Sequence, residues 1–201
     1  MKIKICGIRK LEDALLCESL GADAIGFVLY PQSRRFINPE LIHTITKHLS
    51  PFTLKMGVFV NHSVDEINRI VKTAKLNVAQ IHSIVEDEDL LKIDIPYFNS
   101  YRISKSFNFN SIIDNGYFLL DTLDKDNYGG TGVKFDWNLI PNNLLNKAII
   151  AGGINENDLS ILLNKIKPYG IDLSSSLEDE NGDKSKIKIK SFFTKLHHLR
   201  S

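Results

Sequence analysis

The chain has 201 residues, 43% of them hydrophobic and 24% charged, which is the composition of an ordinary globular protein with one core. Its 25 basic and 24 acidic residues leave a net charge of +1 with no basic block, so neither a nucleic-acid nor a membrane partner is expected. The N-terminus lacks a secretory hydrophobic segment and only two cysteines occur, Cys6 and Cys17, so we expect a reduced, cytoplasmic protein.

Short β-rich runs alternate with amphipathic stretches along the whole chain. Between the starts of the first and last run, at Ile3 and Ile171, the average spacing is about 24 residues, which is typical of βα units. The expected strands are Ile3–Ile8, Ala24–Leu29, Lys55–Val60, Val78–His82, Phe98–Ile103, Tyr117–Thr122, Ala148–Ala151 and Ile171–Ser174.

Helical patterns fill several of the intervening stretches. Leu11–Gly21 ends at a glycine suited to a helix C-terminus, and Asp65–Lys72 places its isoleucines and valine on one stripe. Asn155–Asn164 and Lys186–Leu196 are interpreted in the same way, whereas the polar segment Ser104–Asn115 gives the weakest helical pattern. No linker divides the chain, so residues 1–201 are expected to form a single catalytic domain.

This alternation predicts the α/β class and, more narrowly, a single (βα)8 TIM barrel with parallel strands. An open, doubly wound sheet would also fit the alternation. Eight strands in a chain this short favour closure, because a closed barrel has no edge strands to protect.

Two strands end in residues suited to acid–base chemistry. Cys6, followed by a glycine, ends the first strand, and Asp121 ends the apolar run Phe118–Leu120. Because chemistry in such barrels lies at the C-terminal ends of the strands, a thiol opposite a carboxyl group could act as an acid–base pair. The alternatives are a buried structural cysteine and an aspartate that caps its loop.

The last two strands are followed by segments suited to an anion. Gly152 and Gly153 allow close approach of the backbone, and the helix expected after them directs its N–H groups to the same place. The neighbouring strand end adds backbone donors and hydroxyl groups from Asp172, Ser174, Ser175 and Ser176. These positions predict a phosphate site, although a lone Gly-Gly pair is usually a turn.

Three further features could line a pocket. Arg35, with Arg34 before it, could bind a carboxylate or lie on the surface, as arginines usually do. His82 could face the substrate or be a satisfied core histidine, and Tyr128–Gly132, which includes Gly130, could be a lid or a solvated loop.

Taken in order, these segments resemble phosphoribosylanthranilate isomerase, a family of tryptophan biosynthesis. The resemblance covers nearly the whole chain: Lys4–Ile8, Gly21–Phe27, Ser33–Arg35, Gly57–Asn61, Gln80–His82, Leu119–Asp121, Tyr128–Gly132, Phe135–Trp137, Ala151–Asn155 and Asp172–Ser175.

The resemblance implies an Amadori rearrangement of N-(5′-phosphoribosyl)anthranilate to 1-(2-carboxyphenylamino)-1-deoxyribulose 5-phosphate. It implies that Cys6 is the general base at the second sugar carbon, that Asp121 is the general acid at the ring oxygen, and that Arg35 contacts the anthranilate carboxylate. It also implies that no metal and no organic cofactor is needed. The chain departs from the family pattern at Ser83 and Ser176, where glycine is usual, and in the eighth loop at Leu177–Gly182.

For Ser176 we predict a negative φ in a helical turn, because serine is poorly suited to positive φ and well suited to a helix N-terminus. The rival functions are indole-glycerol-phosphate synthase, the histidine-pathway isomerase, and a barrel that only binds phosphate. The first needs a catalytic lysine at a strand end, the second has aspartate in place of Cys6, and the third has no use for Cys6 and Asp121. A monomer or weak homodimer with a small phosphorylated substrate is expected.

Overall fold

In a computed structural model, the protein contains eight parallel strands that form a closed barrel in chain order. The structure describes residues 1–82, 87–113, 116–122 and 134–201. The strands are β1 (Lys2–Cys6), β2 (Ala24–Val28), β3 (Leu54–Phe59), β4 (Val78–Ile81), β5 (Tyr97–Ile103), β6 (Phe118–Thr122), β7 (Ala148–Ile150) and β8 (Gly170–Leu173).

Helices and helical turns of several kinds connect these strands. The α-helices are α1 (Leu11–Ser19), α2 (Pro39–Thr46), α3 (Val64–Ala74), α4 (Asp87–Leu90), α5 (Leu159–Ile161) and α6 (Lys186–Arg200). Short 3-10 turns are η1 (Phe109–Ser111), η2 (Trp137–Leu139), η3 (Glu156–Asp158) and η5 (Ser175–Leu177), and η4 (Leu162–Ile166) is a π-helical turn.

The predicted fold class is confirmed, and each of the eight expected strands is present within two residues of its expected bounds. The helices expected after Leu11, Asp65 and Lys186 are also present as α1, α3 and α6. Gly21 has φ 103° beyond the end of α1, which is the conformation expected of a glycine that ends a helix.

Two expected helices differ from the prediction. Residues 155–164 form η3, α5 and η4 in succession and not one regular α-helix. The last of these, η4, is π-helical, because the Lys167 amide donates to the Leu162 carbonyl oxygen in an i to i+5 hydrogen bond. In 104–113, the described part of the weakly patterned segment, only the turn η1 forms. There Asn108 accepts a hydrogen bond from the Asn110 amide and caps a turn that does not continue.

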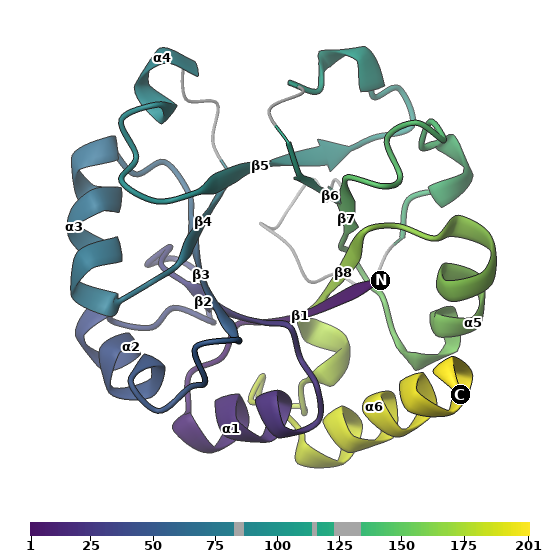
Figure 1. Ribbon diagram of the computed structural model, residues 1–201, viewed down its shortest axis with the longest axis horizontal. Coiled ribbons are helices and arrows are strands. Elements are labelled where there is room, and N and C mark those ends of the chain that lie inside the picture. Colours follow the sequence, from purple (N-terminus) through teal and green to yellow (C-terminus); the bar gives the residue numbers. More distant parts are fainter. Residues whose placement is uncertain (83–86, 114–115, 123–133) are drawn as a thin grey trace. The chain divides into compact units, whose positions relative to one another are not determined.

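The chain divides into two compact units, one of Ile5–Ser100 and one of Met1–Lys4 with Tyr101–Ser201. In the first, β2, β3 and β4 pair in parallel with Val28, Val58 and Gln80 in register. Figure 1 shows α2 and α3 packed along these strands. Asn38 caps α2, and Ser63 with Glu66 forms a capping box at the start of α3, which fixes where each helix begins.

In the second unit, β6, β7 and β8 pair in parallel with Leu120, Ile150 and Ile171 in register. The α6 helix buries Ile189, Phe192, Phe193 and Leu196 on its inner side, and it contacts α5 and η5. The turns that follow β7 and β8, η3 and η5, therefore both contact α6.

Among the described residues, no helix combines the length and the apolar character that crossing a membrane requires.

Candidate active site

Asp121 lies at the C-terminal end of β6, directly after three buried residues, Phe118, Leu119 and Leu120. The pKa of Asp121 is raised from 3.8 to about 6, chiefly by burial and then by the negative charge of Asp172. A hydrogen bond from the Thr122 amide to Oδ1, at 2.8 Å, lowers the pKa, as do the positive charges of Arg102 and Lys4. The carboxyl group can therefore hold a proton close to neutral pH, as a general acid must.

The glycine loop after β7 packs directly against this carboxyl group. Gly152 and Gly153 have φ 88° and 66°, which glycine adopts without strain. A Cβ atom on Gly152 would lie 2.4 Å from Thr122 Oγ1 and 2.9 Å from Asp121 Oδ1, closer than side chains tolerate. Position 152 thus requires glycine for two reasons, its positive φ and its close approach to the end of β6.

Asp172 lies two strands away from Asp121 at the same level of the sheet. The register of Leu120, Ile150 and Ile171 places Asp121, Ala151 and Asp172 one residue further on, and residues in register point to the same face. Asp172 Oδ2 accepts a hydrogen bond from Lys4 Nζ at 2.7 Å, and the two side chains are 8% and 4% exposed. Sequence reasoning overlooked Lys4, although a lysine inside an apolar strand signals a buried partner.

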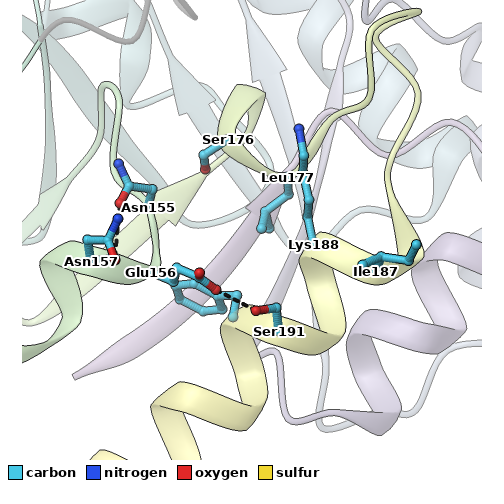
Figure 2. A pocket seen from close by; sticks show the side chains of 9 residues that line it. Asn155, Glu156, Asn157, Ser176, Leu177, Ile187, Lys188 and Ser191 are labelled. Carbon is cyan, nitrogen blue, oxygen red and sulfur yellow. Dashed lines mark hydrogen bonds between the residues drawn. The ribbon is translucent and has the colours of Figure 1, made fainter.

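The segment after β8 turns at once into η5. Ser176 lies within this 3-10 turn and is absent from the residues with positive φ, so the predicted helical turn with negative φ at Ser176 is confirmed. Its Oγ atom is buried and has no hydrogen-bond partner, and it borders a cavity of about 330 Å³ between η3, η5 and the start of α6. Figure 2 shows Asn155, Ser176 and Lys188 around this cavity.

Cys6 ends β1 in the unit of Ile5–Ser100 and is 7% exposed. It packs with Val28 and Val58, and Tyr30 covers this group. The amide groups of Gly7 and Ile8 both donate to the Gly26 carbonyl oxygen, at 3.0 and 3.1 Å, and they fix the turn that follows the thiol. Both cysteines are thiols, and Cys17 is fully buried in α1 as a packing residue, in agreement with its predicted place inside a helix.

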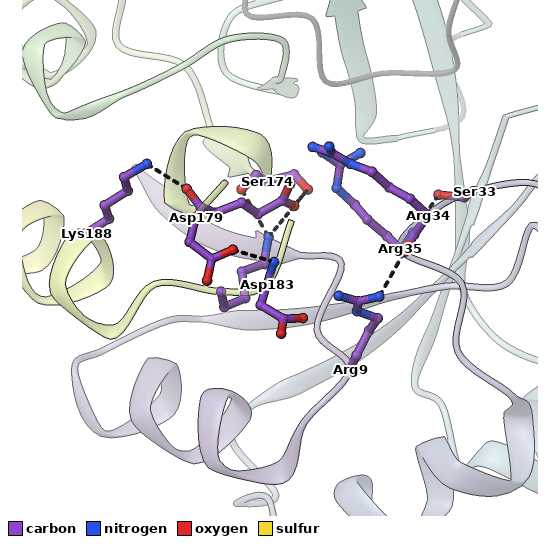
Figure 3. Close-up of polar contacts among 10 residues, drawn as sticks. Arg9, Ser33, Arg34, Arg35, Ser174, Asp179, Asp183 and Lys188 are labelled. Carbon is purple, nitrogen blue, oxygen red and sulfur yellow. Dashed lines mark hydrogen bonds and ion pairs between the residues drawn. The ribbon is translucent and has the colours of Figure 1, made fainter. Parts of the chain in front are cut away.

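The arginine pair after β2 is ordered by local contacts (Figure 3). The Arg35 amide donates to Ser33 Oγ at 3.2 Å, and Arg9 Nη1 donates to the Arg34 carbonyl oxygen at 2.9 Å. Arg35 is only 7% exposed, so it is not the surface arginine that was the alternative interpretation. A buried guanidinium beside the strand ends is suited to a planar anion.

His82 follows β4 and is partly buried. Its amide donates to the Phe59 carbonyl oxygen at 2.8 Å, and its Nε2 atom lies 2.6 Å from Gln80 Nε2. Gly130 and the rest of the expected lid, together with Ser83, lie outside the described residues. Among the residues that are described, no group of three or more His, Cys, Asp or Glu side chains could hold a metal ion.

A parallel barrel with a carboxyl group of raised pKa and with glycine turns at the C-terminal ends of its strands is typical of the (βα)8-barrel enzymes. The family model for N-(5′-phosphoribosyl)anthranilate (PRA) isomerase matches residues 3–195. The chain belongs to this N-(5′-phosphoribosyl)anthranilate isomerase family, as the sequence motifs indicated.

Individual relatives agree over nearly the full length. The N-(5′-phosphoribosyl)anthranilate isomerase of Listeria innocua is 37% identical over 96% of this chain and 96% of its own. The crystal structure of the Thermus thermophilus phosphoribosyl anthranilate isomerase is 34% identical, with a TM-score of 0.85 over all of both chains. A third relative, solved in complex with reduced 1-(o-carboxyphenylamino)-1-deoxyribulose 5-phosphate, is 32% identical, with a TM-score of 0.83 over 99% of this chain and 100% of its own.

Proposed function

We propose that this chain catalyses the Amadori rearrangement of N-(5′-phosphoribosyl)anthranilate to 1-(2-carboxyphenylamino)-1-deoxyribulose 5-phosphate in tryptophan biosynthesis. Besides membership of the family, the observation that carries the proposal is the Asp121 carboxyl group, whose pKa is raised to about 6 at the end of β6. A ring-opening isomerase needs a group that is protonated near neutral pH, and an exposed aspartate would not be.

The proposed chemistry needs one group that donates a proton and one group that accepts a proton. Asp121 donates its proton to the ring oxygen as the bond from that oxygen to the first sugar carbon breaks, and the nitrogen lone pair forms a C=N double bond. Cys6, as a thiolate, removes the proton from the second sugar carbon, and the electron pair of that C–H bond gives the enolamine. Tautomerisation of the enolamine yields the ketone, so the reaction balances without an oxidant or a reductant, and we propose no metal and no organic cofactor.

The remaining predicted residues are proposed to bind the substrate. The backbone of Gly152, Gly153 and the turn after β8 would hold the phosphate, because two adjacent glycines at positive φ and the amides at the start of a helical turn suit an anion. Arg35 would bind the anthranilate carboxylate, and His82 would line the pocket. Within the proposed substrate-binding set are also Gly130, Asp172, Ser174, Ser175 and Ser176.

Residues 1–201 are proposed to act as one catalytic domain, and the protein as a reduced, cytoplasmic monomer or weak homodimer. The partner is then a small phosphorylated substrate, with no role for a nucleic acid. Sedimentation at micromolar concentration distinguishes the monomer from the dimer.

A fluorescence assay tests the activity directly. Phosphoribosylanthranilate is generated in situ from anthranilate, and its consumption is followed on addition of the purified protein. Turnover by the wild type, and its loss in Asp121→Asn, would support the proposal. A wild-type protein that leaves the substrate to decay at its spontaneous rate would refute it. A substrate of the histidine pathway in the same format tests the nearest rival.

A further inference from the structure

The chain after η5 folds back on itself as a small hairpin. Glu178 and Lys184 form an isolated antiparallel bridge, and the Asp179 amide donates to the Asp183 carbonyl oxygen at 2.8 Å. Asp179 Oδ1 accepts from the Asn181 and Asp183 amides, at 2.9 and 3.0 Å. Figure 3 shows Asp179 and Asp183 in this turn. The hairpin's own backbone and side-chain hydrogen bonds thus define its shape.

A buried ion pair joins the two arms of the hairpin. Lys184 Nζ lies 3.0 Å from Glu178 Oε1, and each side chain is only 2% exposed. The same ammonium group donates to the Ser174 carbonyl oxygen at 3.0 Å, and Ser174 Oγ donates to Glu178 Oε1 at 3.3 Å. Both members of the pair therefore contact Ser174, the residue directly after β8.

These contacts hold both ends of η5. The Ser174 carbonyl oxygen accepts from the Leu177 amide at 3.2 Å and from Lys184, so the entry to the turn is fixed twice. At the exit, the Glu178 amide donates to the Ser175 carbonyl oxygen, and Lys188 Nζ from α6 donates to the Glu178 carbonyl oxygen at 2.6 Å. A turn of three residues has little stability of its own, so its shape depends on these contacts from outside it.

Stability alone does not explain why the pair is buried. Removing two charges from water is costly, and well-packed apolar residues of the same volume often stabilise a fold as well or better. Preorganisation is a different benefit, because a binding site that is already in its bound shape has a higher affinity than one that must be ordered.

We propose that Glu178 and Lys184 are positioning residues that hold the η5 turn so that the Ser175 and Ser176 amides are presented to the substrate phosphate. This inference rests on the phosphate site proposed above. Neither side chain touches the substrate in this proposal. If loss of the pair left the turn in its binding shape for only about one tenth of the time, the apparent affinity for phosphate would fall about tenfold.

The test replaces the pair by apolar residues of similar size. Glu178→Met/Lys184→Met is compared with each single variant and with the wild type, by thermal unfolding, by steady-state kinetics and by competitive inhibition with inorganic phosphate. Lys92→Met is the control, since it removes an exposed ion pair with Asp89 that belongs to the other compact unit, Ile5–Ser100.

The double variant should unfold within a few degrees of the wild type, whereas each single variant leaves a buried charge unpaired and should be less stable. The KM of the double variant and its inhibition constant for phosphate should both rise about tenfold, and its kcat should change less than about threefold. Lys92→Met should leave all three constants unchanged. A folded double variant with wild-type KM and wild-type phosphate inhibition overturns the inference.

A second measurement covers the case in which the double variant does not fold. Hydrogen exchange of the Leu177 and Glu178 amides in the phosphate-free wild type should be slow, because the pair holds the turn without ligand. Fast exchange that becomes slow only on addition of phosphate would show that the ligand orders the turn, and would overturn the inference. A wild type that is active but not inhibited by phosphate would instead refute the phosphate site itself.

Discussion

Replacing Asp121 by asparagine should make the protein inactive and, at neutral pH, more stable. In the folded protein the charged form of Asp121 is disfavoured, chiefly by burial and then by the charge of Asp172. The unfolded chain carries no such penalty. Asparagine has a similar shape and keeps an oxygen that can accept the hydrogen bond from the Thr122 amide.

The magnitude follows from linkage between ionisation and folding. A rise in pKa from 3.8 to about 6 corresponds to roughly 3 kcal/mol, at about 1.36 kcal/mol for each pH unit. Below about pH 3.8 Asp121 is protonated in both the folded and the unfolded state, so its burial costs no ionisation energy and this part of the free energy of unfolding is fully present. It is lost progressively as the pH rises through about 6, because the unfolded chain ionises more readily than the folded protein. The stabilisation by asparagine should therefore reach roughly 1–3 kcal/mol at pH 7.5 and fall below about 1 kcal/mol near pH 4.

Urea unfolding at pH 4 and at pH 7.5, followed by circular dichroism, measures this difference. Asp136→Asn is the matched control. The Asn138 backbone amide and side-chain amide both donate to the Asp136 carboxylate and lower its pKa, so neutralising Asp136 should not stabilise the protein at pH 7.5. Two results would refute the reasoning. One is an Asp121→Asn protein no more stable than the wild type at pH 7.5, and the other is a gain that does not diminish toward pH 4.

Three further predictions concern the other groups of the site. Cys6→Ser should lower kcat at least about 100-fold with little change in KM, because a serine hydroxyl is a poor base, and steady-state kinetics that show near-normal turnover would remove Cys6 from the mechanism. Arg35→Ala should raise KM more than it lowers kcat, since the carboxylate it is proposed to bind is charged in ground and transition states alike; a collapse of kcat alone would assign Arg35 to the chemical step. Asp172→Asn should move the alkaline limb of the kcat profile to lower pH, because it removes a negative charge that raises the pKa of Asp121, and an unmoved limb would contradict that coupling.

The strands could be predicted from sequence because most of them are short, largely apolar runs that a polar or glycine residue follows. The run Ala24–Val28 is buried at every position, as expected of a parallel strand covered on both faces. The strand ends could be predicted for the same reason, and so could Asp121, Cys6 and Gly152 as candidate site residues. The negative φ of Ser176 followed from the chemistry of serine alone.

The charged pairs could not be predicted, because their partners are far apart in sequence or look like surface residues. Lys4 and Asp172 are 168 positions apart, and no local pattern joins them. Glu178 and Lys184 lie in a highly charged segment, and charged residues are seldom buried, yet both are buried here. The succession of η3, α5 and η4 likewise could not be predicted, because a periodic pattern does not distinguish 3-10 and π-helical turns from an α-helix.

The Lys4–Asp172 pair bears on how a carboxyl group can serve as an acid at the end of a barrel strand. If desolvation acted alone, the pKa of Asp121 would depend only on how deeply the group is buried. Asp172 adds a negative charge at the same level of the sheet, and Lys4 compensates that charge at 2.7 Å, so the two act on Asp121 in opposite directions. Arg102 adds a second positive charge on the lowering side. A pKa of about 6 is therefore a balance of several groups, which leaves Asp121 able both to give up its proton and to regain it near neutral pH.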